Sequence, residues 1–413
     1  MATKYVNVDR ETPMLLPPDV RDWVAGNDLA HFVLEAVETT DLGAARVNVR
    51  GTGDAQYPPT LMLALLIYSY ATGTFSSRGM ERASYDSLAV RYLCANHHPD
   101  HDTIAKFRRE NGPLLKGCFV RVLELAREVG LLKLGTISVD GTKIAACAGK
   151  KRALHRAELE AELQRLEGEV EELLTRAEAV DRQDDDDGTS LPEELVERTR
   201  RRDRLREARR VLDERRARQR RPDAGNDSVH PGEPESTLMR TAQGAFLQGY
   251  NAQAAVTSEG PTLIVGAQVV SEGNDRRQLV ATLDAIPARL GTADVVLADT
   301  GYDDQQQIEQ LAGRGIKVYC PPQNVARQAP ERSRGCERRH TWQQRRTRQK
   351  EFEQPEVQKI YARRAASSEP CFHVLKRLMG FNRFRLRGLP KVNLEWDLAA
   401  LAYNCRKIAP VWA

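Results

Sequence analysis

A short run of β-branched residues that ends on an acidic residue constrains this chain most. Residues 136–143 read T-I-S-V-D-G-T-K, and β-branched side chains favour a strand because they fit a pleated, half-buried surface. The pattern predicts a strand over residues 136–146 that carries Asp140 to the rim of a sheet. An isolated V-D-G is weak evidence, because Asp-Gly also marks ordinary turns. The interpretation therefore depends on further carboxylates in matching contexts.

Two further acidic residues occur in such contexts. Asp299 follows V-V-L-A at residues 295–298, a continuous apolar run typical of a strand buried on both faces. Glu369 lies in a segment of helical composition apart from Pro370. Asp140, Asp299 and Glu369 are therefore the candidate catalytic residues and metal ligands. Glu395, before Trp396, is the alternative third carboxylate.

The order of the expected elements predicts an α/β fold. The elements that follow residue 222 are strands at 246–256 and 263–270, a helix at 276–289, the strand that ends at Asp299, a helix at 303–312 and a strand at 316–320. With the strand at 136–146, this is the order strand, strand, strand, helix, strand, helix, strand. It is the order of a ribonuclease H-like mixed sheet with flanking helices.

The N-terminal part, residues 1–134, reads as an all-α domain. Its apolar pattern predicts amphipathic helices near residues 61–70 and 114–132. We interpret it as a DNA-binding domain in which basic side chains contact phosphates. The alternative is that these side chains are only solvated helix faces. The candidates are Arg78, Arg82, Lys106, Arg108 and Arg109.

A metal site in this region is a further alternative. Cys94, His97, His98 and His101 are residue types that ligate metal ions. Their sequence context favours instead a loop followed by a helix whose N-terminus is capped by Asp102.

Residues 151–222 change character. Leu159, Leu163, Leu166, Val170 and Leu173 repeat at spacings of four and three, which is typical of a coiled-coil seam. An acid-rich arm is followed by an arginine-rich arm, so we interpret the segment as an antiparallel helical hairpin inserted after the first strand. DNA binding by the arginines is the alternative. Pairing with the acidic arm would neutralise much of their charge, which favours a structural or dimerising role.

Composition limits the remaining classes. The 413 residues are 41% apolar, enough for a sizeable core and two or three domains. The net charge is only +4, so a basic surface for nucleic acid must be local. The N-terminus has no apolar targeting segment and the longest apolar run, residues 61–71, is too short to cross a bilayer. We expect a cytoplasmic protein. Seven cysteines without C-x-x-C pairing argue against a disulfide framework or a structural zinc site.

At this point the sequence resembles a known family, the bacterial insertion-sequence DDE transposases with an InsH-like N-terminal domain. The resemblance covers most of the chain. Ordered matches carry it: P-P-T-L-M-L-A-L-L-I-Y-S-Y-A at 58–71, S-R-G-M-E at 77–81, P-D-H-D-T-I-A-K-F-R-R at 99–109, D-G-T at 140–142, Q-G-Y-N-A-Q-A-A-V at 248–256, A-D-T-G-Y at 298–302, and a block from Tyr361 through Glu369-Pro370, Lys376, 379–381 and 387–389 to Glu395-Trp396 and Asn404.

The resemblance implies a ribonuclease H-like catalytic domain over residues 135–408. It implies that Asp140, Asp299 and Glu369 hold two divalent ions, Mg²⁺ with Mn²⁺ as a substitute. Water would cut the DNA at the element's ends, and the freed 3′-hydroxyl would join them to target DNA. Cys371 and His373 depart from the family pattern, which usually has small or aliphatic residues there.

The same resemblance implies DNA as the partner: the terminal inverted repeats and the target, bound by a homodimer that is nucleoid-associated when on DNA. Neither a membrane nor a small-molecule substrate is expected. Two basic tracts are DNA-binding candidates, a flexible arm at 323–352 and the run after Phe381. The residues expected to bind DNA are Tyr361, Arg364, Lys376, Arg383, Arg385, Arg387, Arg108 and Arg109.

Two alternatives to a transposase stay open. One is a ribonuclease H-like nuclease that cuts without joining. The other is a transposase-derived DNA-binding protein whose active site no longer works, which Cys371 and His373 would favour.

Overall fold

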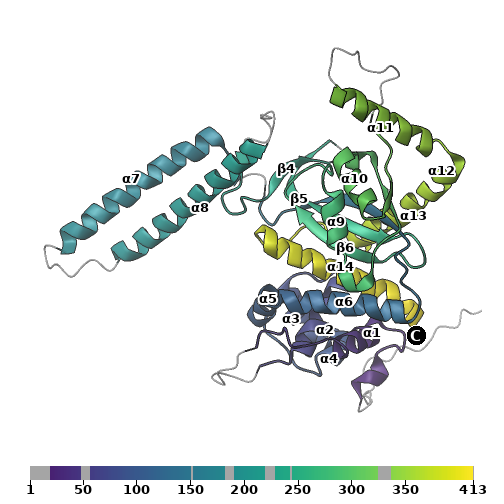
Figure 1. The fold of residues 1–413 in the computed structure, drawn as a ribbon. Coiled ribbons are helices and arrows are strands. Elements are labelled where there is room, and N and C mark those ends of the chain that lie inside the picture. Colours follow the sequence, from purple (N-terminus) through teal and green to yellow (C-terminus); the bar gives the residue numbers. More distant parts are fainter. Residues whose placement is uncertain are drawn as a thin grey trace, which may run out of the picture.

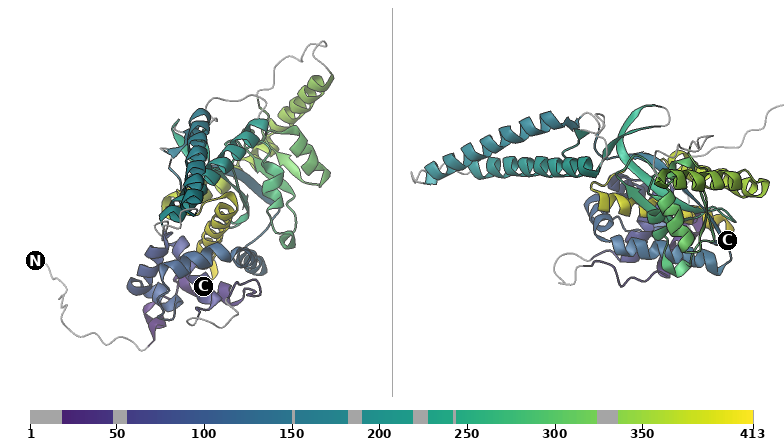
Figure 2. Two further views of the ribbon diagram at one scale, coloured as in Figure 1. Left: turned by 90° about the vertical axis from the view of Figure 1, so that its left-hand side faces the viewer. Right: turned by 45° about the horizontal axis from the view of Figure 1, so that its top comes forward.

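The computed structural model describes residues 19–47, 56–149, 152–181, 190–218, 228–241, 244–323 and 336–412. A helical layer lies beside a mixed sheet, and a pair of long helices projects from the body (Figures 1 and 2). Within the described part of the chain, no helix has the length and apolarity needed to span a membrane.

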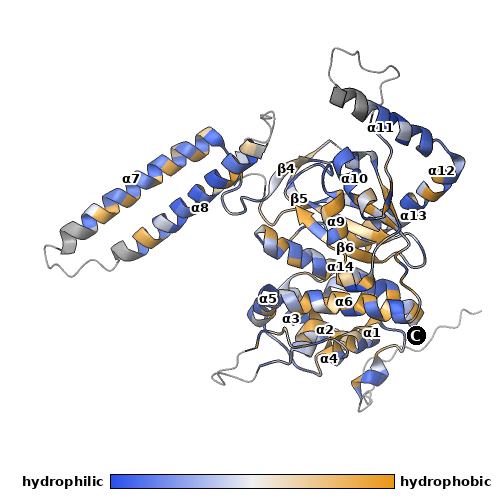
Figure 3. Ribbon diagram, in the orientation of Figure 1, coloured by the Kyte–Doolittle hydropathy of each residue, from blue (hydrophilic) through white to orange (hydrophobic). Residues whose placement is uncertain are grey.

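The helical layer is built from the N-terminal part of the chain. Its helices are α1 (Leu29–Glu38), α2 (Pro59–Ala71), α3 (Ser77–Asp86), α4 (Leu88–Leu93), α5 (His101–Glu110) and α6 (Gly112–Glu128), after a 3₁₀ turn at Val20–Trp23. Apolar residues concentrate in α1 and α2 (Figure 3).

Two expectations for this layer were wrong in detail. The segment expected to be amphipathic is α2, which is buried on every side from Leu61 to Ala71 because α1, α4 and the C-terminal helix surround it. An all-round apolar helix of this kind belongs inside a core. The N-cap of α5 is Asp100 and not Asp102: its Oδ1 accepts hydrogen bonds from the backbone N–H groups of Asp102 and Thr103, each at 2.9 Å.

The central sheet has the strand order β4-β5-β1-β7-β8, and β6 also pairs with β5. Its strands are β1 (Thr136–Ala145), β4 (Thr237–Arg240), β5 (Phe246–Thr257), β6 (Ile264–Val270), β7 (Val295–Ala298) and β8 (Lys317–Tyr319). The pairs β1–β7 and β7–β8 are parallel, and β5 is antiparallel to β1, β4 and β6. The five strands expected from the sequence are present, whereas β4 was not foreseen.

Short helices connect the strands of the sheet. α9 (Leu279–Asp284) and a 3₁₀ turn at Ala288–Leu290 lie between β6 and β7, and α10 (Gln305–Gly313) lies between β7 and β8. A separate two-stranded sheet, β2 (Leu154–His155) with β3 (Ser228–Val229), closes the base of the projecting helices. That small sheet has no counterpart in the sequence pattern.

The C-terminal helix α14 (Leu389–Trp412) joins the helical layer to the sheet. Its Asn404 and Asn393 hydrogen-bond to both backbone groups of Ile264 and of Val269 on β6, at 2.8 to 3.2 Å. These amide groups satisfy strand backbone that has no neighbouring strand there. One continuous apolar core therefore runs from α1 through α14 into the sheet.

The projecting helices are α7 (Arg156–Asp181) and α8 (Ser190–Arg218), which run antiparallel (Figure 1). Their apolar residues form a cluster of their own, separate from the main core. Ion pairs such as Arg201–Glu162, and Arg206–Glu167 at 2.8 Å, link the two helices across the seam. The members of the cluster are Leu159, Leu163, Leu166, Leu205, Ala208, Leu212 and Val229.

Three helices follow β8: α11 (Cys336–Phe352), α12 (Pro355–Tyr361) and α13 (Arg363–His373), and a π-helical turn at Val374–Leu378 extends α13. The flexible arm expected at 323–352 is therefore helical from Cys336 onward, and residues 324–335 lie outside the described part. Arg348 of α11 pairs at 2.6 Å with Asp303, whose side chain is fully buried. That pair holds α11 against the body of the protein.

Candidate active site

Two of the three predicted carboxylates lie side by side in the sheet. The parallel pairing of β1 with β7 sets Val139 opposite Ala298, so Asp140 and Asp299 are the next residues along their strands. Asp299 directly follows Ala298, the last residue of β7, whereas Asp140 lies in the middle of β1, which continues to Ala145 beside β5. The sequence predicted that Asp140 lies at the rim of the sheet. Asp140 lies where the pairing of β1 with β7 ends, and β1 itself continues beyond it.

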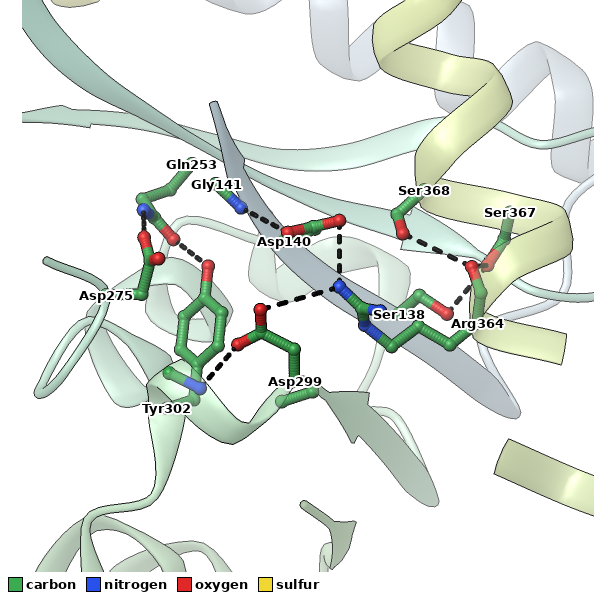
Figure 4. A network of polar contacts seen from close by, with 12 residues as sticks. Ser138, Asp140, Gly141, Gln253, Asp275, Asp299, Tyr302, Arg364, Ser367 and Ser368 are labelled. Atoms are coloured by element: carbon green, nitrogen blue, oxygen red, sulfur yellow. Dashed lines mark hydrogen bonds and ion pairs between the residues drawn. The ribbon is translucent and has the colours of Figure 1, made fainter. Parts of the chain in front are cut away.

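A single arginine connects the two aspartates. Nη2 of Arg364, from the first turn of α13, lies 3.0 Å from Oδ2 of Asp140 and 3.8 Å from Oδ2 of Asp299 (Figure 4). The side chains of Asp140 and Arg364 are each 15% exposed, and that of Asp299 is 40% exposed. The remaining Oδ1 atoms accept backbone hydrogen bonds, from Gly141 at 2.9 Å and Gly301 at 2.8 Å.

Burial and charge act in opposite directions on these groups. Burial raises the pKa of Asp140, although the charge of Arg364 opposes the shift. Burial also acts to lower the pKa of Arg364, but the charges of Asp140, Tyr361, Asp299 and Glu369 outweigh it and raise that pKa. A positive charge between the two carboxylates is therefore electrostatically favoured.

Serine hydroxyls fix α13 against the strand that carries Asp140. Ser367 Oγ donates to Ser138 Oγ at 2.7 Å, and both serines are buried. This contact sets the position at which α13 crosses β1, with Arg364 one turn before it (Figure 4). The preceding helix is held by Tyr361, whose hydroxyl donates to the carbonyl of Ala298 at 3.2 Å.

The third predicted carboxylate, Glu369, does not contact the two aspartates. It is exposed on α13, and no hydrogen bond or ion pair joins it to another described residue. Its charge nevertheless contributes to the raised pKa of Arg364, which places it in the surroundings of that guanidinium. Cys371, two residues on, is fully buried in the core, and His373 is exposed.

Glu395, the alternative third carboxylate, belongs to a different network. It is fully buried, and it accepts hydrogen bonds from Tyr70 Oη at 2.9 Å and from the backbone N–H groups of Arg385 and Leu386 at 2.8 Å. This side chain links the helical layer to α14. We therefore withdraw it as a ligand candidate.

Arg108 requires a second correction. It is 5% exposed, and Nη1 donates to Tyr70 Oη at 3.0 Å and to the carbonyl of Phe75 at 2.9 Å. An interior guanidinium with these partners is not presented to DNA, so the expected phosphate contact was wrong. Arg109, its neighbour, is exposed.

The other predicted DNA-binding residues lie in the π-helical turn after α13 and in the segment that follows Phe381. Lys376 is half-buried and donates to the carbonyl of Lys143 at 2.9 Å, and burial lowers its pKa. Arg383, Arg385 and Arg387 are exposed. Arg383 donates to the carbonyl of Ala146 at 2.9 Å, so the loop after Phe381 borders the C-terminal half of β1.

Sequence reasoning missed Asp275, which lies in the loop between β6 and α9. Its Oδ1 accepts hydrogen bonds from Asn251 Nδ2 at 2.8 Å and Gln253 Nε2 at 2.7 Å, and Gln253 accepts one from the buried hydroxyl of Tyr302 (Figure 4). A lone acidic residue in a loop carries no periodic signal. Only Gln253 and Tyr302, inside motifs already singled out, pointed to this region.

The donor set fits a divalent cation in two respects. Carboxylate oxygens are the ligands that Mg²⁺ and Mn²⁺ prefer, and the guanidinium between Asp140 and Asp299 shows that their position favours a positive charge. Among the described residues, no three His, Cys, Asp or Glu side chains are close enough together to hold a metal ion. The two aspartates alone form the part of the site that is already assembled.

A mixed α/β sheet with paired aspartates on neighbouring parallel strands is typical of enzymes that cut phosphodiesters with metal ions. Residues 194–405 match the family described as "Transposase DDE domain", and residues 19–110 match "Transposase domain (DUF772)". The first match covers more than half of the chain, and the chain belongs to the insertion-sequence DDE transposases, which act on DNA and generally use divalent metal ions. No curated protein and no solved structure matches it.

The matched regions include Asp299 and Glu369 but not Asp140. The long helices α7 and α8 separate β1 from the rest of the sheet along the chain.

Proposed function

We propose that this transposase cuts the ends of an insertion sequence and joins them to target DNA at a site built on Asp140, Asp299 and Glu369. The observation that carries the proposal is the placement of Asp140 beside Asp299 with one guanidinium between them. The strand order of the sheet supports a ribonuclease H-like domain over 135–408, interrupted at 151–222. The match of residues 19–110 to a transposase domain supports an N-terminal DNA-binding domain over 1–134.

Two divalent ions, Mg²⁺ or Mn²⁺, would supply activation of the attacking oxygen and stabilisation of the leaving oxygen. Asp140 and Asp299 would hold them from the sheet, and Glu369 from α13. The Glu369 side chain is exposed and has no hydrogen-bond or ion-pair partner in the described part of the chain. No contact in the described part of the chain therefore has to break for Glu369 to bind a cation.

The chemistry consists of two displacements at phosphorus. Water attacks the phosphodiester at each end of the element, and the 3′-oxygen of that end leaves. The free 3′-hydroxyl then attacks a phosphodiester of the target DNA, and the target's own 3′-oxygen leaves. The number of phosphodiester bonds is conserved in the second step, and no covalent protein intermediate is needed.

The basic residues around α13 would hold the DNA. Arg364 offers a fork of donors for phosphate oxygens and Lys376 a point charge. The exposed residues Arg383, Arg385 and Arg387 extend this surface along β1. Arg109, on the helical layer, and Tyr361, which positions the start of α13, complete the proposed set.

Two DNA ends have to be joined in one reaction, which requires at least two active sites. We propose a homodimer that uses α7 and α8 as a coiled-coil hairpin. Exposed Leu174 and Val196, at 47% and 46%, lie away from the hairpin's own apolar cluster and offer an apolar contact for a second copy.

The test is cleavage of a DNA fragment that carries the sequence flanking this gene, in Mg²⁺ or Mn²⁺, by the intact protein and by Asp140→Ala, Asp299→Ala and Glu369→Ala. Metal-dependent nicking at the element's ends and joined products are expected from the intact protein only. Each substitution should reduce both activities by about 100-fold or more, because it removes a metal ligand.

The matched control is Asp294→Ala. Asp294 is exposed and directly precedes Val295, the first residue of β7, at the end of the strand opposite to Asp299. It should leave cleavage unchanged. Cleavage without joined products would indicate a nuclease, and DNA binding without cleavage would indicate an inactive relative. Full activity of Glu369→Ala would remove Glu369 from the site.

A further inference from the structure

Asp275 lies against the strand that carries Asp140. It is half-buried in the loop between Val270, which ends β6, and Leu279, which begins α9. Its Oδ1 accepts both side-chain N–H groups that Asn251 and Gln253 present from β5, the strand paired with β1. Both amide residues are buried, so the position of the Asp275 carboxylate is fixed by the sheet.

Gly141, directly after Asp140, leaves space that Asp275 occupies. A Cβ atom at Gly141 would clash with Asp275 Oδ1 and with Gln253 Nε2. A Cβ at Gly301 would lie 3.5 Å from Asp275 Oδ2. Gly141 thus permits Asp275 to approach β1. The Cβ position at Gly301 is also 2.9 Å from Asp299 Oδ1, so the Asp275 and Asp299 carboxylates border the same space.

Tyr302 supports this arrangement from the turn after Asp299. Its buried hydroxyl donates to Gln253 Oε1. That bond fixes the Gln253 amide so that its N–H group faces Asp275 (Figure 4).

Only one of the two Asp275 oxygens is used by these contacts. Oδ2 has no hydrogen-bond or ion-pair partner within the described residues and lies on the side of Gly301. The adjacent Arg276 and Arg277 are directed to Asp304, at 3.5 and 3.7 Å. Among the described residues, Arg364 is the arginine that pairs with Asp140 and Asp299. The three aspartates therefore carry more negative charge than this one arginine neutralises.

We propose that Asp275 is a further anionic residue of the divalent-cation site, and that it strengthens cation binding through its charge while Asn251 and Gln253 hold it in place. The inference rests on the proposed function, because it assumes that Asp140 and Asp299 bind the cation. It adds a residue that the predicted triad does not contain.

The experiment measures Mn²⁺ affinity of the full-length protein, without DNA, by isothermal titration calorimetry and by the electron paramagnetic resonance signal of free Mn²⁺. The variants are Asp275→Asn, which keeps an acceptor oxygen but loses the charge, and Asp275→Glu, which keeps the charge but displaces the hydrogen bonds. Asp275→Asn should weaken Mn²⁺ binding about tenfold or more, and Asp275→Glu should retain more affinity than Asp275→Asn.

The opposite order would overturn the inference, because it would show that Asp275 acts only through its hydrogen bonds. Asp284→Asn, at the other end of α9 and paired with Arg314, is the control and should not change the affinity. Loss of binding in Asp140→Asn but not in Asp275→Asn would reject Asp275 and leave the proposed function standing. Unchanged binding in Asp140→Asn would reject both.

Discussion

Arg364 shows how one residue can set the properties of a site. In the sequence, Arg364 precedes Ser367, the serine that fixes α13, by one helical turn. Its partner Asp140 lies 224 residues away on β1. The guanidinium is mostly buried, and its Nε has no hydrogen-bond partner in the described part of the protein. Its interaction is therefore concentrated on the two aspartates, and a cation that binds them has to compete with it.

Replacement of Arg364 tests this competition. Arg364→Gln removes a positive charge 3.0 Å from Asp140 and should strengthen Mn²⁺ binding about tenfold, since a fixed like charge opposes the cation. Arg364→Lys, which keeps the charge, should change the affinity less. Calorimetric titration of the DNA-free protein measures both. Weaker binding by Arg364→Gln would mean that the arginine organises the carboxylates rather than competing for them.

Burial separates residues that the sequence presents as equivalent. Arg108 and Arg109 are neighbours of one type, but Arg108 follows the buried Ile104 by four residues and shares its face of α5. Helical periodicity alone could have indicated this. Asp275 is different, because nothing in its local sequence sets it apart from other loop acids.

At the scale of the element, α14 is the helix on which the fold depends. It covers the β6 backbone with Asn393 and Asn404 and carries Trp396, whose indole N–H donates to the Gln253 carbonyl at 2.9 Å. It also carries Asp397. Burial raises the pKa of this carboxyl to about 7, and the charge of Lys116 on α6 opposes the shift more weakly. A carboxylate on this helix is therefore held in an environment that disfavours its charge.

This burial predicts a pH dependence of stability. A carboxyl whose folded pKa is above its unfolded value of about 3.9 contributes stability that is present at low pH and is lost as the pH rises to about 7. Asp397→Asn should therefore raise the melting temperature at pH 8 by roughly 2 to 5 °C and leave it nearly unchanged at pH 4. Thermal unfolding at both pH values measures the difference.

The comparison requires a variant without a buried charge. Asp102→Asn changes a side chain that is 91% exposed and should give no pH-dependent difference from the intact protein. An equal effect of Asp397→Asn at pH 4 and pH 8 would show that the amide acts by packing and not by loss of the charge.

At the scale of the whole molecule, the described residues form two larger apolar cores and a small third cluster of Leu297, Tyr319 and Val357. One runs from the helical layer through α14 to the sheet, and the other lies between α7 and α8. The Glu395, Tyr70 and Arg108 network joins the helical layer to α14 within the first core. Because the two cores are separate, we expect the projecting helices to unfold independently of the body.

A substitution in the second core tests this independence. Leu166→Ala removes a fully buried side chain between α7 and α8 and should destabilise that helix pair by about 2 to 5 kcal/mol. Hydrogen exchange should accelerate in α7 and α8 while protection in β1 and α14 is retained. Glu172→Ala, at an exposed position of α7, should change neither. Faster exchange in β1 as well would mean that the cores unfold together.

The sequence by itself determined most elements of this protein. Apolar runs and β-branched residues are local properties, so they predicted β1, β5, β6, β7 and β8, and the leucine spacing predicted the long helices. The same local patterns placed Asp140 on a strand and Asp299 at the end of one, and the structure has Asp299 directly after β7. The family resemblance that they supported is confirmed by the two domain matches.

Only the tertiary structure decided which side chains meet. The contacts of Arg364 with Asp140, of Glu395 with Tyr70 and of Asp275 with Gln253 join residues that are 224, 325 and 22 positions apart. Local periodicity carries no information about such pairs, because they depend on how the strands register and how the helices cross them. Burial of Arg108 and exposure of Glu369 have the same origin: the energy of a charged side chain depends on the neighbours that packing brings to it.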